Sequence, residues 1–138
     1  MNEDEIFFVG QKAFIEKDGK VLVLRRSDGG RLDLPGGKIQ TDETDFVKSL
    51  KREVMEETGL EIEVGEPFIT WYNNFPEGHR NAGKKIFLVG YKCQYKSGEI
   101  ALSEEHASYQ WVNKNNYDEL KDTSKNFVAL EKFFAKRS

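Results

Sequence analysis

Short runs of hydrophobic residues alternate with polar turns through the first part of the chain. Phe7 to Ile15 has the composition of a β-strand, and the Asp-Gly pair of KDGK predicts a tight turn. Val21 to Arg26 predicts a second strand, so these runs together indicate a β-hairpin. Ser27 to Gly37 then holds four glycines and one proline without a hydrophobic period. We expect a long connection there, with an accessible backbone.

A helical period begins after this connection. Between Thr44 and Thr58 the hydrophobic residues recur at helical spacing: Phe46, Val47, Leu50, Val54 and Met55. Gly59 stands where a left-handed residue commonly ends a helix. The pattern predicts a helix with one apolar sector facing the core, which we assign to Phe46, Val47, Leu50 and Val54.

The second half of the chain contains three further strand-like runs and a closing helix. We predict strands over Glu61–Asn73, Lys85–Tyr95 and Ser108–Val112, and a flexible loop or wide hairpin end over the Asn- and Gly-rich segment Trp71–Lys84. From Ser124 to Lys136 one helical face is hydrophobic, formed by Phe127, Leu130, Phe133 and Phe134. This order of elements predicts an α/β fold in which a mixed sheet lies between helices.

Composition limits the classes of protein to be considered. The chain has 138 residues, enough for one domain with a sizeable core, and we expect residues 1–138 to form it. A net charge of −3 with scattered Lys and Arg argues against a nucleic acid polymer as partner. No apolar run approaches the roughly 20 residues that span a bilayer, and the acidic start predicts a cytoplasmic protein. Cys93 cannot form an internal disulfide, and we expect it to be buried as a small hydrophobe.

Three glutamates, Glu53, Glu56 and Glu57, lie close together near the end of the predicted helix. The simplest interpretation is a solvated face. However, Glu53 and Glu57 fall beside the apolar sector at about 100° per residue, and like charges four residues apart destabilise a helix by a few tenths of a kcal/mol. Acids near a helix C-terminus also oppose its dipole. We therefore predict a bound cation, for which Mg²⁺ or Mn²⁺ suits a group of carboxylates.

The stretch LPGGK, Leu34 to Lys38, is the candidate for the other half of such a site. Glycines let backbone carbonyls and N–H groups approach a metal or a phosphate closely. Taken alone, the same glycines would suit a simple turn equally well.

Together these segments, GGKIQTDETDFVKSLKREVMEETGL, resemble the Nudix box. Nine positions match the pattern in type: Gly37, Glu43, Arg52, Glu53, Val54, Glu56, Glu57, Gly59 and Leu60. One departure is clear, because eight residues, Thr44 to Lys51, stand where the pattern has seven. We expect the extra residue at the start of the helix, with Thr44 or Asp45 as its N-cap and with Glu43 displaced from Arg52.

The resemblance implies the Nudix fold, an α/β/α sandwich with a central mixed sheet. It also implies hydrolysis of a phosphoanhydride in a nucleoside diphosphate linked to another group, such as a nucleoside triphosphate, an oxidised nucleotide or a nucleotide sugar. By the same resemblance Glu53, Glu56, Glu57 and the carbonyl of Gly37 bind Mg²⁺, with Mn²⁺ as an alternative, and Arg52 orients Glu53. Many members of the family are homodimers. The competing hypothesis, a nucleotide-sensing domain without catalysis, has no need for all three glutamates.

Residues outside the box supply further candidates. For the general base we name Glu104 and Glu105, with Glu56 as the alternative inside the box, although the pair would also suit a solvated loop. Next to them, His106 could contact phosphate, but a surface histidine is the favoured interpretation.

Substrate binding is assigned to cations and glycines near the box, namely Arg25, Arg26, Gly36, Gly37 and Lys38. Since alternate residues of a strand face opposite ways, Arg25 or Arg26 could hold a phosphate, and a solvated strand end is the alternative. Trp71, Tyr72 and Phe75 could stack on a base, although packing in the core or hairpin is favoured. By the family resemblance, Trp111 is a core residue.

Overall fold

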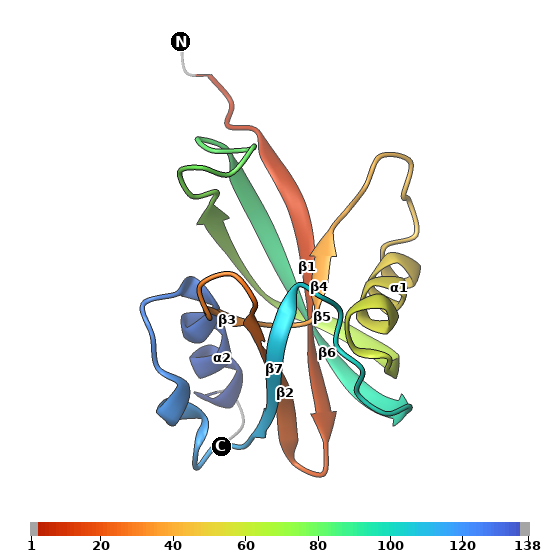
Figure 1. Cartoon of the computed structure of the whole chain (residues 1–138). Helices are drawn as coiled ribbons and strands as arrows, with labels where there is room; N and C mark the ends of the chain where they lie inside the picture. The colour runs from red at the N-terminus through yellow and green to blue at the C-terminus, as the bar shows by residue number, and fades with distance from the viewer. Residues whose placement is uncertain (1–2, 136–138) are drawn as a thin grey trace.

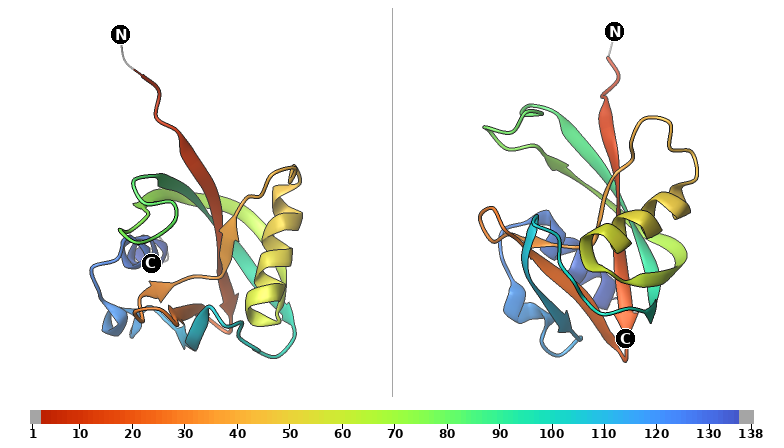
Figure 2. Two further views of the ribbon diagram at one scale, coloured as in Figure 1. Left: turned by 45° about the horizontal axis from the view of Figure 1, so that its top comes forward. Right: turned by 45° about the vertical axis from the view of Figure 1, so that its right-hand side comes forward.

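A computed structural model describes residues 3–135 of the chain. The elements in chain order are β1 (Phe7–Lys17), β2 (Lys20–Arg26), β3 (Leu32–Asp33), β4 (Gly36–Lys38), α1 (Phe46–Thr58), β5 (Glu61–Asn74), β6 (Lys85–Ser97), β7 (His106–Val112), the 3₁₀ helix η1 (Tyr117–Leu120) and α2 (Lys125–Ala135). The two α-helices lie on opposite sides of the strands (Figure 1). Figure 2 shows the same arrangement from two further directions.

The strands form one mixed sheet with the order β3-β2-β1-β6-β5. β1 and β6 run parallel, whereas the other pairs are antiparallel. β4 also pairs with β1, and β7 pairs with β2. One edge of β1 therefore pairs with two different strands, with β4 near Gln11 and with β2 near Glu16. The glycine-containing β4 thus lies beside the first part of β1, and β2 lies beside the last part.

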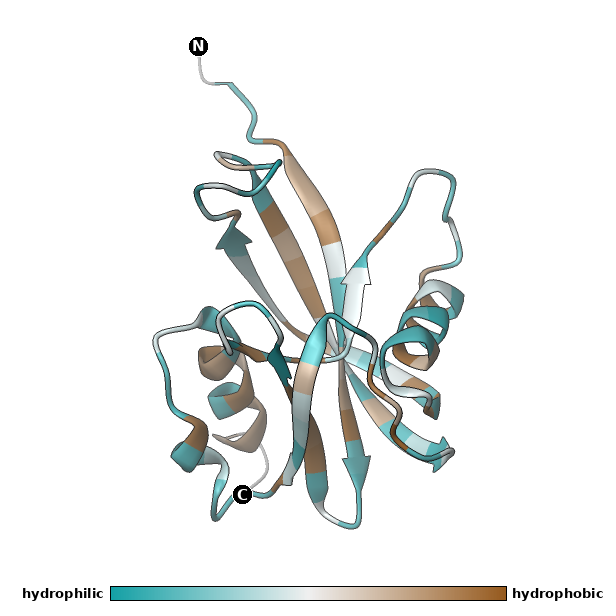
Figure 3. Ribbon diagram, viewed as in Figure 1, coloured by the Kyte–Doolittle hydropathy of each residue, from teal (hydrophilic) through white to brown (hydrophobic). Residues whose placement is uncertain are grey.

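Both faces of the central strands are buried, which explains the sandwich. Phe14, Val21 and Val23 belong to a cluster that includes the hydrophobic face of α2, whereas Leu22 and Leu24 belong to a second cluster with α1. Successive residues of a strand point to opposite faces, so each central strand contributes to both clusters. Leu50 and Val54 are the buried hydrophobic residues of α1, and Figure 3 shows hydrophobic colour on the side of this helix that is turned toward the strands.

The turn chemistry of the sequence is confirmed. Asp18 and Gly19 both have positive φ, at 53° and 77°, in the hairpin between β1 and β2. Gly59 ends α1 with φ of 77°, and its N–H donates to the carbonyl of Met55.

Cys93 is buried, as expected, with 1% of its surface exposed, and burial raises the pKa of its thiol to about 12.

The apolar sector predicted for the first helix is wrong in part. Its buried residues are Ser49, Leu50, Val54 and Thr58, whereas Phe46, Val47 and Met55 are about half exposed. Leu50, Val54 and Thr58 are four residues apart and form one narrow stripe, which is the side that meets the sheet. Hydrophobic residues outside that stripe stay in contact with water.

Three other differences concern segment ends. The glycine-rich connection contains the short strands β3 and β4, which no period of its own predicted. β5 continues through Trp71 as far as Asn74, so the loop before β6 is shorter than expected. α2 is described up to Ala135, and the predicted end at Lys136 lies outside the described residues. Over residues 3–135, no helix is both long and apolar enough to cross a membrane.

Candidate active site

The glycines of β4 are held where a side chain would not fit. Gly36 has φ of 143°, and a Cβ atom there would collide with the backbone carbonyl of Gln11 on β1. A Cβ atom on Gly37 would collide with the carboxylate of Glu53 on α1. The missing side chains therefore let the backbone of this loop lie directly against the acidic face of α1.

The glutamates of α1 occupy three different environments. Glu56 is largely exposed, with 61% of its side chain accessible, whereas Glu53 has 16% accessible. Glu57 accepts a hydrogen bond of 3.0 Å from the N–H of Gly36. Burial raises the pKa of Glu53, and burial raises the pKa of Glu57 to about 7. Two of the three carboxylates are thus held in a setting that disfavours their charge unless a cation joins them.

The expected displacement of Glu43 is wrong. Its Oε2 accepts hydrogen bonds of 2.8 Å from Nη2 of Arg52 and from Oγ of Ser49. Hydrogen bonds from the backbone of Gln40 and from Arg52 lower the pKa of Glu43 to about 2. Asp45 is the N-cap and accepts from the N–H of Lys48, so the extra residue is absorbed before the helix begins and Glu43 still reaches Arg52.

Arg52 has more than the one partner that the resemblance implied. Its Nη1 donates to Glu56 at 2.8 Å, while Oε1 of Glu53 lies 3.6 Å from Nη2. The guanidinium is therefore closer to Glu43 and Glu56 than to Glu53. Its positive charge therefore offsets the negative charges of all three of these glutamates.

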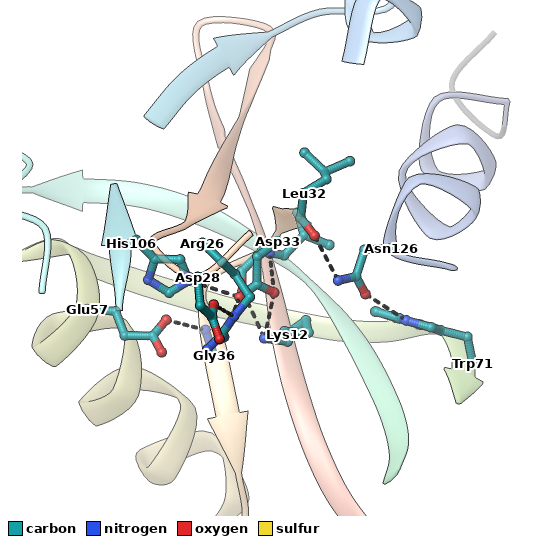
Figure 4. Close-up of polar contacts among 11 residues, drawn as sticks. Lys12, Arg26, Asp28, Leu32, Asp33, Gly36, Glu57, Trp71, His106 and Asn126 are labelled. Atoms are coloured by element: carbon teal, nitrogen blue, oxygen red, sulfur yellow. Dashed lines mark hydrogen bonds and ion pairs between the residues drawn. The ribbon is translucent and has the colours of Figure 1, made fainter. Parts of the chain in front are cut away.

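A buried polar cluster that the sequence did not reveal lies beside Gly36 (Figure 4). Asp33 accepts from Nζ of Lys12 at 3.0 Å, and its Oδ2 lies 2.9 Å from Nε2 of His106 and 3.5 Å from Nη1 of Arg26. Burial alone would raise the pKa of Asp33, but the charge of Lys12 and the hydrogen bond with His106 hold it well below its usual range. Asp33 is therefore a carboxylate, and burial makes its partners indispensable.

His106 is the main correction among the individual residues. It was expected at the surface, yet only 4% of it is exposed. The reason is strand pairing, because β7 pairs with β2 and sets His106 opposite Arg26, next to the buried Asp33.

The segment that precedes His106 brings one of the two candidate bases into the site. Ser27 holds the segment through hydrogen bonds to the carbonyls of Glu104, at 2.6 Å, and Glu105, at 2.8 Å. The side chain of Glu105 lines the same cavity as Glu53, Glu56 and Glu57, and Glu104 does not. Glu57, Glu105 and His106 each offer a potential ligand atom within 4.8 Å of the others.

Two neighbouring cavities share lining residues at this cluster. The first, of about 500 Å³, is lined by the box glutamates, Gly36, Gly37 and Lys38. The second, of about 680 Å³, extends from Arg25 and Arg31 to Asn73, Asn74 and Asn126. Lys12, Arg26, Asp33 and Phe75 line both. One elongated ligand could thus reach from the acidic face of α1 to the start of α2.

The remaining predicted residues divide between cavity and core. Arg25 and Arg26 line the second cavity, where Arg25 contacts Asp122 at 3.5 Å. Phe75 packs against the rings of Phe8 and His79, as the favoured interpretation expected, and it also borders both cavities. Trp71 and Trp111 pack against the two hydrophobic clusters, and Tyr72 is 44% exposed.

Comparison with known proteins adds independent findings. The family model described as NUDIX domain matches residues 12–133. A MutT-like protein of Streptomyces ambofaciens is 30% identical over 105 residues, covering 76% of this chain and 62% of its own length. A CTP pyrophosphohydrolase of Escherichia coli (strain K12) is 28% identical over 132 residues, covering 91% of this chain and 90% of its own length. The crystal structure of a MutT protein from Methanosarcina mazei Go1 superposes with a TM-score of 0.80 and 27% identity, covering 99% of this chain and 98% of that one.

Proposed function

This chain belongs to the Nudix family, and from that premise we propose that it hydrolyses a phosphoanhydride bond in a nucleoside diphosphate linked to another group, with Mg²⁺ or Mn²⁺ bound. The observation that carries the proposal is the contact between α1 and β4. There Glu53 and Glu57 lie against the backbone of Gly36 and Gly37, at the wall of a cavity that also holds cationic side chains.

The residues present fit a divalent cation. The site offers carboxylate oxygens from Glu53, Glu56 and Glu57, and the main-chain carbonyl of Gly37 belongs to the same loop. Oxygen donors of this kind are the ligands that Mg²⁺ and Mn²⁺ prefer. The raised pKa of Glu57, together with its burial, supports the same interpretation, since a cation would stabilise the charged form.

When bound, the cation would neutralise phosphate charge and acidify or position the attacking water. The side chains of this chain would do the rest. Glu105 is the best-placed general base, because its carboxylate lines the cavity beside Glu57, whereas Glu104 does not. Lys12, Arg26 and Lys38 would hold phosphate oxygens, since all three line the cavity that contains the glutamates.

The second cavity would receive the nucleoside. Phe75 offers an aromatic face at the junction of the cavities, and the amides of Asn73, Asn74 and Asn126 can both donate and accept hydrogen bonds. Nucleoside triphosphates are our first substrate candidates, because one relative that aligns over nearly its full length is named CTP pyrophosphohydrolase.

A substrate screen tests the proposal. The purified chain would be incubated with Mg²⁺ and a panel of nucleoside triphosphates, oxidised nucleotides and nucleotide sugars, and the products identified by ³¹P NMR. Hydrolysis in water enriched in ¹⁸O would show which phosphorus is attacked. We expect turnover that stops on chelation of the metal. Binding without turnover across the panel would favour the nucleotide-sensing alternative.

A further inference from the structure

Two buried polar side-chain atoms have no hydrogen-bond partner within residues 3–135, namely Oγ of Ser103 and Nδ1 of His106. Both belong to one turn, in which the N–H of His106 donates to the carbonyl of Ser103 at 3.2 Å. The turn is attached to the end of α1, because the N–H of Ser103 donates to the carbonyl of Glu57 at 3.1 Å. Unpaired buried polar atoms are costly, so something that the protein itself does not provide should meet them.

Hydrogen bonding decides which ring nitrogen of His106 is free. Nε2 lies 2.9 Å from Oδ2 of Asp33. The other oxygen of this carboxylate, Oδ1, accepts a hydrogen bond from Lys12. A carboxylate only accepts, so Nε2 must carry the proton, and in a neutral imidazole Nδ1 is then left as a lone pair. A carboxylate that orients a histidine in this way is the usual outer partner of a metal-binding imidazole.

Two carboxylates lie close to His106. Glu57 and Glu105 come from α1 and from the turn before β7, and potential ligand atoms of Glu57, Glu105 and His106 lie within 4.8 Å of one another. We propose that Glu57, Glu105 and His106 form a second divalent cation position that prefers Mn²⁺, Co²⁺ or Zn²⁺ to Mg²⁺. A nitrogen ligand strengthens binding of first-row transition-metal ions, least for Mn²⁺ and more for Co²⁺ and Zn²⁺, whereas Mg²⁺ takes oxygen ligands.

The inference rests on the proposed function only in that Glu57 is shared with the box glutamates. Its distinctive claim is the nitrogen ligand, which the Nudix box does not contain. Glu105 can take part in both roles, because one carboxylate oxygen can bind the cation while the other accepts a proton.

Pulsed electron paramagnetic resonance of the 138-residue chain loaded with Mn²⁺ tests this directly, because a coordinated imidazole gives a ¹⁴N coupling. The chain has two histidines, so His79→Gln is the matched control. We expect the coupling in the wild type and in His79→Gln, and its loss in His106→Gln. Equilibrium dialysis should show about one fewer Mn²⁺ in His106→Gln, and the preference for Mn²⁺ over Mg²⁺ should fall at least about tenfold.

Glu105→Gln provides a second variant, because Glu105 is exposed and its replacement should not disturb folding. It too should bind about one fewer Mn²⁺ and lose ¹⁴N coupling, so the test stands even if His106→Gln fails to fold. Mn²⁺ bound to the wild type without ¹⁴N coupling, or with coupling that persists in His106→Gln, would overturn the inference and leave the proposed function intact. No Mn²⁺ uptake at all would overturn both.

Discussion

At the scale of single residues, Glu57 shows how folding and metal binding can oppose each other. Its carboxylate is mostly buried against the glycine loop, and that burial raises its pKa to about 7. Without a cation, Glu57 of the folded protein therefore stays protonated between about pH 4.5 and 7, whereas Glu57 of the unfolded chain is ionised in that range. The contribution of Glu57 to stability is largest below about pH 4.5 and is lost as the pH rises through about 7.

Glu57→Gln should therefore remove most of the activity while stabilising the metal-free protein at pH 8 by about 1–3 kcal/mol. The amide oxygen can still accept from Gly36, and the buried charge is gone. Urea denaturation at pH 8 and pH 4.5, with chelator present, would measure the gain and its disappearance at low pH. Glu56→Gln is the control, because its side chain is 61% exposed. It should leave stability within about 0.5 kcal/mol. Wild-type kcat in Glu57→Gln would disprove the metal assignment.

Glu104 and Glu105 are adjacent in sequence but differ in placement, which gives a matched pair of variants. Glu105→Gln should lower kcat by about 10²- to 10⁴-fold, whereas Glu104→Gln should stay within about twofold of the wild type. The reason is that only Glu105 lines the cavity with the box glutamates. Steady-state kinetics on the substrate found in the screen would check this. Near-wild-type rates for both variants would return the role of base to Glu56.

At the scale of elements, the segment before α1 accommodates the extra residue of the box. Asp45 caps the helix through the N–H of Lys48, and Ser49 and Arg52 both reach back to Glu43. The residues before the helix thus absorb the change in spacing, and the positions from Leu50 onward keep their register. The acidic face is unaffected as a result.

Asp45→Ala should destabilise the protein by about 1 kcal/mol, because it removes the side chain that caps the helix. Thr44→Ala, one residue earlier, makes a suitable comparison, since Asp45 and not Thr44 is the N-cap. Urea denaturation of both variants would measure the difference, and kcat should stay unchanged because the glutamates lie two turns away. Equal losses of stability would show that the cap is not specific to Asp45.

At the scale of the whole molecule, Asp33 joins segments that are far apart in sequence. It connects β3 with Lys12 on β1 and with His106 on β7, and it lies where the two cavities meet. Because the pKa of Asp33 is lowered by the charge of Lys12 and by hydrogen bonds despite burial, the carboxylate stabilises the fold above its unfolded pKa of about 4. That contribution is lost as the pH falls from about 4 toward the lower pKa of Asp33 in the folded protein.

Asp33→Asn should destabilise the protein by about 3–5 kcal/mol at neutral pH, since it leaves Lys12 buried without its counter-charge. Asp28→Asn removes a carboxylate that pairs with Arg26 but is 73% exposed, so it should cost less than about 1 kcal/mol. Thermal unfolding at pH 7 and pH 3 would compare them, and the difference between the wild type and Asp33→Asn should shrink at pH 3. A loss for Asp33→Asn no larger than that for Asp28→Asn would contradict the role of this ion pair.

The sequence by itself determined the features that depend on neighbouring residues. The Asp18-Gly19 turn, the glycine cap at Gly59 and the helical period after Asp45 follow from backbone preferences and spacing. The Nudix box could be found for the same reason, because Glu53, Glu56 and Glu57 lie within a single helix. The α/β class followed from the order of these elements.

Only the tertiary structure decided which distant residues join the box. Residues of β7 reach the site because β7 pairs with β2 and sets His106 opposite Arg26, eighty positions earlier in the chain. No hairpin turn joins these two strands, so their register is set only when the whole sheet assembles. The burial of His106, the ion pair between Lys12 and Asp33, and the choice of Glu105 over Glu104 all follow from that register. Helix packing decided the exposure of Phe46 and Val47, since the sheet covers only one narrow stripe of α1.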